Sequence, residues 1–132
     1  MSRGKVHRVN ELQGYAALLN GVIKASVSYY VDNWECEIVS LESAMQNQGL
    51  GSKLVQLVVE QAKERQCKRV WLITSNDNVR AIRFYQKRGF DMKAIHYDAI
   101  TEARKLKPAI PLIGDDGIPV RHEVEFEMIL SS

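Results

Sequence analysis

Residues 46–53 read Gln-Asn-Gln-Gly-Leu-Gly-Ser-Lys, a polar, glycine-rich stretch between two segments with different hydrophobic periods. Before it, the β-forming residues 34–42 predict a strand that places Glu35, Glu37, Val39 and Leu41 on one face. After it, apolar residues recur at spacings of three and four positions and predict a helix that ends near Arg65. A strand that turns into a helix in this way exposes unpaired backbone amides at the helix N-terminus, so we expect an anion-binding site here.

Two common phosphate-binding loops are excluded at this turn. A Walker loop needs a glycine five residues before Gly-Lys-Ser/Thr, whereas Gly51 is followed by Ser52 and position 46 is Gln. A dinucleotide fingerprint needs a third small residue three positions after Gly51, where Leu54 stands. The pattern that remains is QxxGxG followed by a helix.

The sequence before this loop predicts three antiparallel strands. Residues 15–19 and 22–31 are rich in β-forming residues, and the Asn20-Gly21 dipeptide between them tolerates the two positive φ angles of a tight hairpin. A second turn signal at Asp32-Asn33 precedes the strand of residues 34–42. Residues 1–13 have no clean period and are left open between a short strand and a helix.

The sequence after the first helix predicts a strand-helix-strand crossover. Residues 70–73 form a short apolar run typical of a strand buried on both faces, and Asn76-Asp77-Asn78 offers N-caps for a second helix that Gly89 closes. Residues 90–97 return to strand, and residues 100–107 can hold two helical turns. Three prolines between positions 108 and 119 mark a loop before the closing strand of residues 122–130. In that strand we expect Val124, Phe126, Met128 and Leu130 inward and Glu123, Glu125 and Glu127 outward.

These elements predict a single domain over residues 1–132 with a mixed, mostly antiparallel α/β sheet, a central strand-helix-strand crossover and helices on both faces. Residues 1–13 are uncertain within it, and residues 98–121 form a proline-containing loop. The composition, 45% hydrophobic and 26% charged with a net charge of +2, is that of a globular chain and gives no reason to expect nucleic-acid or membrane partners. We expect a cytoplasmic protein with reduced, packed Cys36 and Cys67. His7, His96 and His122 lack metal-ligand spacing, so no metal is expected.

Two motifs in this order, Gln46-x-x-Gly49-x-Gly51 and Asn78-x-x-Ala81-x-x-x-Tyr85-x-Lys87-x-Gly89-Phe90, resemble the GNAT superfamily of acetyl-CoA-dependent N-acetyltransferases. The resemblance covers residues 14–98 and extends to the closing strand. It implies that the first loop holds the pyrophosphate of acetyl-CoA and that the second helix flanks its pantetheine arm. Asn78 and Tyr85 share a helix face about 10 Å apart, at 1.5 Å per residue, and Asn78 can serve as an N-cap, as an arm contact or as both.

The cofactor-binding residues that the resemblance implies come from the strand, the loop and the second helix. They are Val39, Leu41, Gln46, Asn47, Gln48, Gly49, Leu50, Gly51, Ser52, Lys53, Asn78, Ala81 and Tyr85. The family's usual proline before the loop is replaced by Leu41-Glu42-Ser43, and the arginine often found beside the first loop glycine is Asn47 or Gln48 here. Pyrophosphate binding would then depend more on backbone amides, with Lys53 in support.

Direct acetyl transfer needs a neutral amine, a stabilised oxyanion and a protonated leaving thiolate. Because a lysine-like amine has a pKa near 10.4, a general base is useful. Glu35, eleven residues before Gln46 and at a position where some family members carry a glutamate, is the first candidate, with Glu37 or water as alternatives. Tyr85 is the candidate to protonate the thiolate, and backbone amides around residues 39–41 are the expected oxyanion donors. An acyl-cysteine route is less favoured, because neither cysteine has a histidine nearby in sequence.

The sequence therefore predicts an N-acetyltransferase that transfers the acetyl group of acetyl-CoA to a primary amine of an unidentified small-molecule or protein acceptor. The alternative is a coenzyme-A-binding or protein-interaction domain with little activity. Only residues 1–13 precede the hairpin, where family members usually carry a strand and two helices, so we expect an N-terminally abbreviated member. Residues 98–121 could replace those helices as an acceptor wall. A homodimer could form through the closing strand or the front hairpin.

Overall fold

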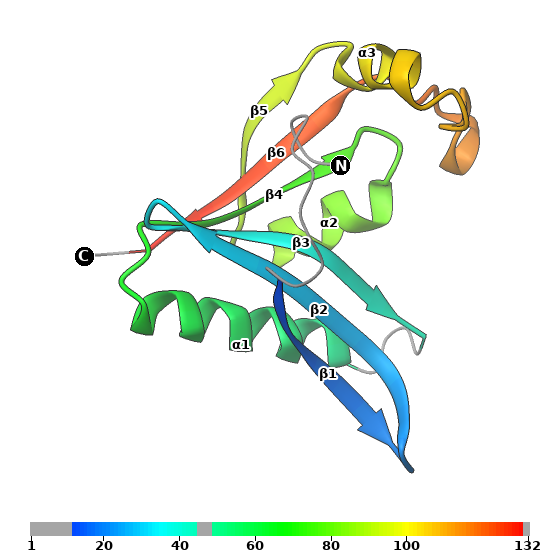
Figure 1. The fold of residues 1–132 in the computed structure, drawn as a ribbon. Helices are drawn as coiled ribbons and strands as arrows, with labels where there is room; N and C mark the ends of the chain where they lie inside the picture. The colour runs from blue at the N-terminus through cyan, green and yellow to red at the C-terminus, as the bar shows by residue number, and fades with distance from the viewer. Residues whose placement is uncertain (1–11, 45–48, 131–132) are drawn as a thin grey trace. The chain divides into compact units, whose positions relative to one another are not determined.

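The computed structural model describes residues 12–44 and 49–130 and shows a mixed α/β fold (Figure 1). The elements in chain order are β1 (Gln13–Leu19), β2 (Val22–Asp32), β3 (Glu35–Ser43), α1 (Leu50–Glu64), β4 (Arg69–Ser75), α2 (Val79–Lys87), β5 (Asp91–His96), α3 (Ala99–Leu106), the 3-10 turn η2 (Asp115–Gly117) and β6 (Glu123–Ile129). The six strands lie in the hydrogen-bonded order β1-β2-β3-β4-β6-β5. The β1–β2, β2–β3 and β5–β6 pairs are antiparallel, and β3–β4 is parallel. The predicted fold class is confirmed.

The chain divides into two compact units. Of the described residues, the N-terminal unit holds 12–44, 49–71 and 129–130, and the C-terminal unit is Leu72–Met128. The chain passes from one unit to the other within β4, since residues 69–71 belong to the first and residues 72–75 to the second.

Two tight turns shape the strands of the N-terminal unit. Asn20 and Gly21 have φ angles of 54° and 78°, as the predicted hairpin requires. The second turn lies one residue later than expected, because Asn33 and Trp34, rather than Asp32 and Asn33, adopt positive φ angles of 53° and 64°. Trp34 is consequently a turn residue with 57% of its surface exposed, and β3 begins at Glu35.

Helix α1 lies against β1, β2 and β3 (Figure 1) and closes the core of this unit. Its buried residues are Leu54, Val55, Val58 and Ala62, and β2 contributes Ala25, Val27 and Tyr29 to the buried set. On the same helix Leu57 is 40% exposed, whereas Val55 is buried.

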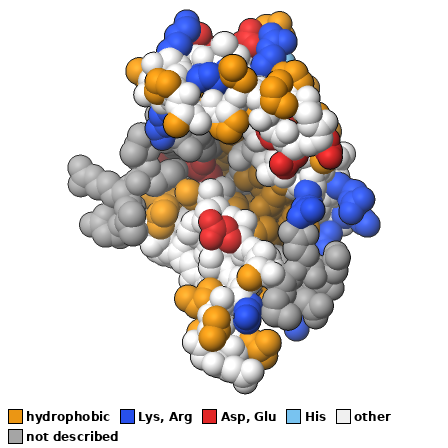
Figure 2. All heavy atoms as spheres, turned by 90° about the vertical axis from the view of Figure 1, so that its right-hand side faces the viewer, with side chains coloured by type: hydrophobic (Ala, Val, Ile, Leu, Met, Phe, Trp, Pro, Cys, Tyr) orange, Lys and Arg blue, Asp and Glu red, His pale blue; other side chains and the backbone are white. Residues whose placement is uncertain are grey.

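The tip of the β1–β2 hairpin carries exposed apolar side chains. Leu18, Leu19, Val22 and Ile23 are each at least half exposed, and Figure 2 shows hydrophobic atoms gathered at this lower end of the molecule.

The C-terminal unit places α2 and α3 on opposite faces of β6. Tyr85 of α2 packs near Phe126, with 6.2 Å between ring centroids, whereas Glu123 lines a cavity together with Ile100 and Ala103 of α3. Residues 123 and 126 have opposite parity along a strand, so their side chains lie on opposite faces. This agrees with the predicted helices on both faces. The expectation that Glu123 points to solvent is wrong, since it is only 7% exposed.

Local signals at the ends of α2 act as the sequence predicts. Asn78 is the N-cap, and its side-chain oxygen accepts a hydrogen bond from the Ala81 N–H at 3.1 Å. At the other end Gly89 has a φ angle of 93°, and Phe90 donates its N–H to Tyr85 O at 3.0 Å while its side chain is buried. Among the helices of residues 12–44 and 49–130, none combines the length and apolar character that a membrane crossing requires.

Candidate functional site

The start of α1 leaves backbone N–H groups without a side-chain cap. Gly49 is the N-cap, with a φ angle of 75° and no side-chain cap hydrogen bond, and the first helical turn contains no acidic residue. The first hydrogen bond of the helix runs from Lys53 N–H to Gly49 O at 3.1 Å, so the N–H groups of residues 50–52 precede the helical ladder. Gly51 and Ser52 are half-buried and Lys53 is exposed. The predicted contacts Gln46, Asn47 and Gln48 lie outside the described residues.

Strand β3 changes its pairing next to this helix start. Its parallel ladder with β4 joins Glu35, Cys36 and Glu37 to residues 69–71. On the β2 side the register shifts, because Tyr29 pairs with Ile38 while Ser28 pairs with Ser40. Val39 is therefore the extra residue of a β-bulge, a feature that redirects local backbone groups. Val39 and Leu41, both half-buried, follow the end of the parallel ladder, where the sequence places the oxyanion and pantetheine contacts.

The two candidate bases on β3 have different surroundings. Glu35 is paired with Arg69, whose Nε lies 3.1 Å from Glu35 Oε1, and its side chain is 37% exposed. The Arg69 guanidinium also lies over the Trp71 ring at 5.0 Å from its centroid. Glu37 is only 2% exposed and stands opposite Tyr30 on β2 and Trp71 on β4. Glu35 and Glu37 are two residues apart in the strand, so their carboxylates lie on the same face.

The motif residues of α2 occupy the C-terminal unit. Besides capping the helix, Asn78 donates from Nδ2 to Thr74 Oγ1 at 3.2 Å. An amide side chain has two donors and two acceptor lone pairs, so one of each is left for a further contact. Ala81 is half-buried. Asn78, Ala81 and Tyr85 therefore lie along one helix as expected, and the residues of α1 and β3 belong to the other unit.

Tyr85 is a buried phenol. It is 5% exposed, and its ring packs edge-on against Phe84 and Phe90 at centroid distances of 5.0 and 5.4 Å. Burial raises the pKa of Tyr85 well above the usual value near 10, because the phenolate would lose its hydration. The hydroxyl is therefore protonated at physiological pH and is a donor.

Both cysteines are packed thiols. Cys36 is fully buried and Cys67 is 5% exposed. Burial raises the pKa of Cys36 to about 12, with the neighbouring Cys67 adding to the shift, and burial also raises the pKa of Cys67. A protonated, inaccessible thiol is a poor nucleophile, so the geometry does not favour an acyl-cysteine route.

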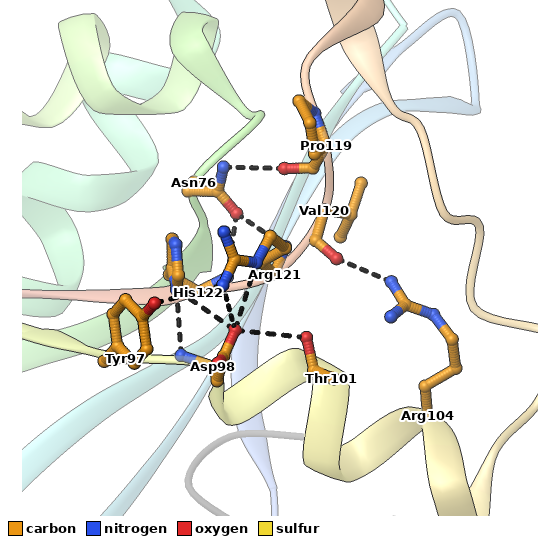
Figure 3. A network of polar contacts seen from close by, with 9 residues as sticks. All are labelled: Asn76, Tyr97, Asp98, Thr101, Arg104, Pro119, Val120, Arg121 and His122. Atoms are coloured by element: carbon orange, nitrogen blue, oxygen red, sulfur yellow. Dashed lines mark hydrogen bonds and ion pairs between the residues drawn. The ribbon is translucent and has the colours of Figure 1, made fainter.

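A polar network fixes α3 to the start of β6 (Figure 3). Asp98, the N-cap of α3, accepts hydrogen bonds at Oδ1 from Arg121 Nε and Nη2 at 3.1 and 2.9 Å. Its own N–H donates to His122 Nδ1 at 2.8 Å, and the His122 ring stacks on Tyr97 at 4.8 Å. From α3, Arg104 donates to the carbonyl oxygens of Ile110, Pro111 and Val120.

The turn between β4 and α2 holds the other side of this segment. Asn76 Nδ2 donates to Pro119 O at 2.8 Å, and Asn76 Oδ1 accepts from Arg121 N–H and His122 N–H, both at 2.9 Å (Figure 3). Next to it, Asp77 is 9% exposed and accepts from Asp115 N–H at 3.2 Å through Oδ2. Residues 98–121 are thus held by hydrogen bonds to the residues that follow β4, immediately before Asn78. We refer to them as the wall segment.

A cavity of about 300 Å³ lies between the wall segment and β4. Its apolar lining comes from Ile73, Ile100, Ala103, Ile110 and Val120. Polar lining residues include Thr74, Lys107 and Glu123. A volume of this size is at the lower end of the range for small-molecule sites.

The clamp at Asp77, the buried position of Glu123 and the cavity are not predicted by the sequence. The sequence predicts Asp77 only as a helix cap and Glu123 only as one of three outward glutamates. The signal available for Asp77 was its place after a buried strand, beside Asn78. For Glu123, the alternation of residues along the strand predicts which face of the strand it occupies. The alternation does not predict which other element covers that face.

A bulged strand leading into a glycine-started helix, followed by a crossover and an asparagine-capped helix with a buried tyrosine, defines an α/β protein of the N-acetyltransferase fold. Residues 3–90 match the acetyltransferase (GNAT) family, and the chain belongs to that family.

Its relatives agree with this membership. The chain is 44% identical over 126 residues to YdhI of Bacillus subtilis, an uncharacterized protein, with 95% of this chain and 79% of YdhI covered. It resembles a GNAT family acetyltransferase from Elizabethkingia anophelis solved with acetyl-CoA bound, with a TM-score of 0.81 and 25% identity over 92% of this chain and 78% of the other. A Bacillus subtilis acetyltransferase solved in complex with CoA has a TM-score of 0.80 at 24% identity, covering 93% and 80% of the two chains, which shows the shared fold.

Proposed function

We propose that this protein is an N-acetyltransferase that transfers the acetyl group of acetyl-CoA directly to a primary amine within a ternary complex. The observation that carries the proposal is the arrangement of β3 and α1. The parallel ladder of β3 ends at Glu37, Val39 forms a bulge, and the helix that follows begins at an uncapped Gly49. The acetyl-CoA-bound relative supports the choice of cofactor.

In this proposal the pyrophosphate binds at the start of α1. The amides of Leu50, Gly51 and Ser52 donate to its oxygens, and the positive end of the helix dipole favours its charge. Lys53 and the loop residues Gln46, Asn47 and Gln48 supply further contacts. The pantetheine arm pairs with backbone groups of Val39 and Leu41, and Asn78 and Ala81 flank it.

The chemistry is an acyl transfer that needs no metal. The neutral amine nitrogen attacks the thioester carbonyl, a C–N bond forms, and the C–S bond breaks to release coenzyme A. Backbone amides around residues 39–41 hold the developing oxyanion. The proton lost by the amine passes to a base, for which Glu35 is the first candidate and Glu37 or water the alternatives, and the sulfur leaves as a thiolate.

Tyr85 serves the leaving group as a hydrogen-bond donor. The ordinary pKa of a tyrosine, near 10, already exceeds that of a thiol, near 8.5. Burial raises the pKa of Tyr85 further, so complete proton transfer from the phenol to the thiolate would be uphill. A hydrogen bond from the protonated hydroxyl to the departing sulfur stabilises the charge without that cost. The thiolate then takes its proton from solvent or from the proton released by the amine.

We further propose that the wall segment bounds the acceptor site. Arg104, Asn76 and Asp77 hold it in place beside Thr74, which is hydrogen-bonded to Asn78. A residue that flanks the pantetheine is therefore one hydrogen bond away from a residue that lines the cavity.

The test measures acetyl-CoA binding by calorimetry and thiol release with a panel of polyamines, amino acids, aminoglycosides and peptides. We expect Tyr85→Phe to lower turnover by about 100-fold while acetyl-CoA affinity stays within about threefold, because the aromatic packing is preserved. Tyr97→Phe, at an exposed tyrosine in the same unit, is the matched control and should leave the cofactor affinity unchanged. Cofactor binding without turnover of any amine would favour the alternative of a coenzyme-A-binding module, and an absence of cofactor binding would refute both.

A further inference from the structure

The cavity beneath α3 combines an apolar body with a buried carboxylate. Four of its apolar lining residues are branched aliphatic side chains, and Ile100 and Val120 are largely buried. Glu123, also on the lining, is 7% exposed. A carboxylate in such surroundings interacts strongly with a cation, because little water screens it.

We propose, resting on the proposed function, that this cavity binds the acceptor, and that the acceptor is a compact primary amine with an apolar body. The body occupies the space among Ile73, Ile100 and Val120, and the ammonium donates hydrogen bonds to Glu123. A carboxylate offers about four lone-pair positions, so Glu123 can receive an ammonium in addition to its contacts within the chain.

Lys107 affects which group the acceptor can carry at the end opposite its ammonium. This residue lines the same cavity and is exposed to solvent, so it marks the open side. A second ammonium on the ligand would approach the Lys107 charge, whereas a neutral or anionic end would not be repelled. The cavity therefore favours monoamines and amino acids over diamines and polyamines.

The cavity lies next to Asn78, the residue proposed to flank the pantetheine arm. Thr74 lines the cavity and accepts a hydrogen bond from Asn78 Nδ2 at 3.2 Å. Bound at Glu123, the ammonium first releases one proton to solvent. The neutral nitrogen then forms the C–N bond with the acetyl carbon while the C–S bond of acetyl-CoA breaks, and the second proton lost by the nitrogen ends on the sulfur to give coenzyme A. All atoms come from the two substrates.

Four six-carbon probes test this inference by calorimetry on the full chain, without cofactor. We expect hexylamine to bind, and hexan-1-ol, which lacks the ammonium, to bind at least tenfold more weakly. We expect 6-aminohexanoate to bind at least as tightly as hexylamine, and 1,6-diaminohexane more weakly. Lys107→Met should remove the difference between these last two ligands.

Two variants address the cavity from different sides, each with a matched control on α3. Glu123→Gln removes the charge and should weaken hexylamine by at least tenfold, whereas Glu102→Gln, at an exposed glutamate, should not. Ala103→Leu places added atoms in the cavity and should weaken all four probes, whereas Ala99→Leu, which is not among the lining residues, should not. If Glu123→Gln does not fold, Ala103→Leu decides the result.

The outcomes separate this inference from the proposed function. Acetylation of other amines by a chain that neither binds nor acetylates hexylamine would overturn the inference and leave the acetyltransferase proposal standing. Hexylamine binding that neither Glu123→Gln nor Ala103→Leu weakens would also overturn it. Binding lost in both variants, in a chain that acetylates no amine, would support the cavity as an amine site and count against the proposed activity.

Discussion

The start of α1 and the wall segment differ in how the chain builds them. The candidate pyrophosphate site at α1 consists of consecutive backbone amides behind Gly49, so a short run of sequence specifies it. The wall segment depends on side chains that contact partners far along the chain, such as Asn76 with Pro119, 43 residues away, and Asp77 with Asp115, 38 residues away. A motif therefore identifies the candidate cofactor site more readily than the proposed acceptor site.

The same difference predicts how each region responds to mutation. A site made of backbone amides tolerates most side-chain substitutions and is disturbed mainly by substitutions at residues with unusual φ angles. A segment held by side-chain contacts is disturbed when one of those contacts is removed or crowded. Substitutions in the wall segment should alter amine turnover and stability, and substitutions at α1 should alter acetyl-CoA affinity.

The largest effect is expected from Gly114→Ala. An ideal Cβ at Gly114 would lie 2.0 Å from Asp77 Oδ2 and 2.8 Å from Val120 Cγ2, so the loop or the Asp77 clamp must move. We expect a loss of about 3 kcal/mol in the free energy of unfolding and a loss of amine turnover, with acetyl-CoA affinity retained. Urea denaturation and calorimetry measure these quantities.

Gly117→Ala is the control for this change. An added Cβ there meets no atom within 4 Å, although its φ angle is 73°, so only backbone strain of about 1 kcal/mol is expected. An equal loss in the free energy of unfolding for Gly114→Ala and Gly117→Ala would contradict the close contact between position 114 and Asp77.

The next effect concerns Arg104, which ties α3 to the proline-containing loop. Arg104→Met keeps the aliphatic stem but removes the donors to Ile110 O, Pro111 O and Val120 O, and we expect a loss of about 2 kcal/mol in the free energy of unfolding. Lys105→Met, on the same helix, removes only an exposed pair with Glu102 and should have almost no effect. Hydrogen exchange should localise the Arg104→Met change to residues 106–120, and uniform exchange would argue against a local wall.

The fold was largely predictable because its signals are local. Asn20-Gly21, Asn78 and Gly89 each act within a few residues, and all three behave as expected. The Val39 bulge and the turn at Trp34 depend on the register with a neighbouring strand, which periodicity alone does not contain. Glu123 shows the same limit for the site, because strand alternation assigns its face correctly while α3, a distant element, covers it.

The core of the N-terminal unit should respond to alkaline pH. Burial raises the pKa of Cys36 from 9.0 to about 12, so the unfolded chain releases this proton at lower pH than the native chain. The stabilisation is fully present below pH 9 and is lost as pH rises from 9 towards 12. For Cys36 alone, the loss between pH 9 and 10 is about 1 kcal/mol.

Urea denaturation at pH 8, 9 and 10 measures this dependence, and Cys36→Ala should flatten it by about that amount, whatever its cost at pH 8. Tyr85→Phe is the comparison, and it should leave the pH dependence between pH 8 and 10 nearly unchanged, because an unfolded tyrosine titrates mainly above pH 10. An unchanged slope in Cys36→Ala would show that this thiol is not buried as a neutral group.

The smallest effect, and the one that most sharpens the contrast, is expected from Gly49→Ala. Nothing lies within 4 Å of an added Cβ, so the substitution acts only through the φ angle of 75°. Strain there shifts the amides of residues 50–52, and we expect acetyl-CoA affinity to fall about threefold, in line with a change of less than 1 kcal/mol at a helix N-terminus. Gly21→Ala, with a φ angle of 78° and equally open surroundings in the hairpin, should cost similar stability without changing that affinity. Calorimetric titration of both variants with acetyl-CoA decides the matter. Equal affinities would mean that the backbone at the start of α1 does not hold the cofactor, and the cofactor side would then depend on side chains as the wall segment does.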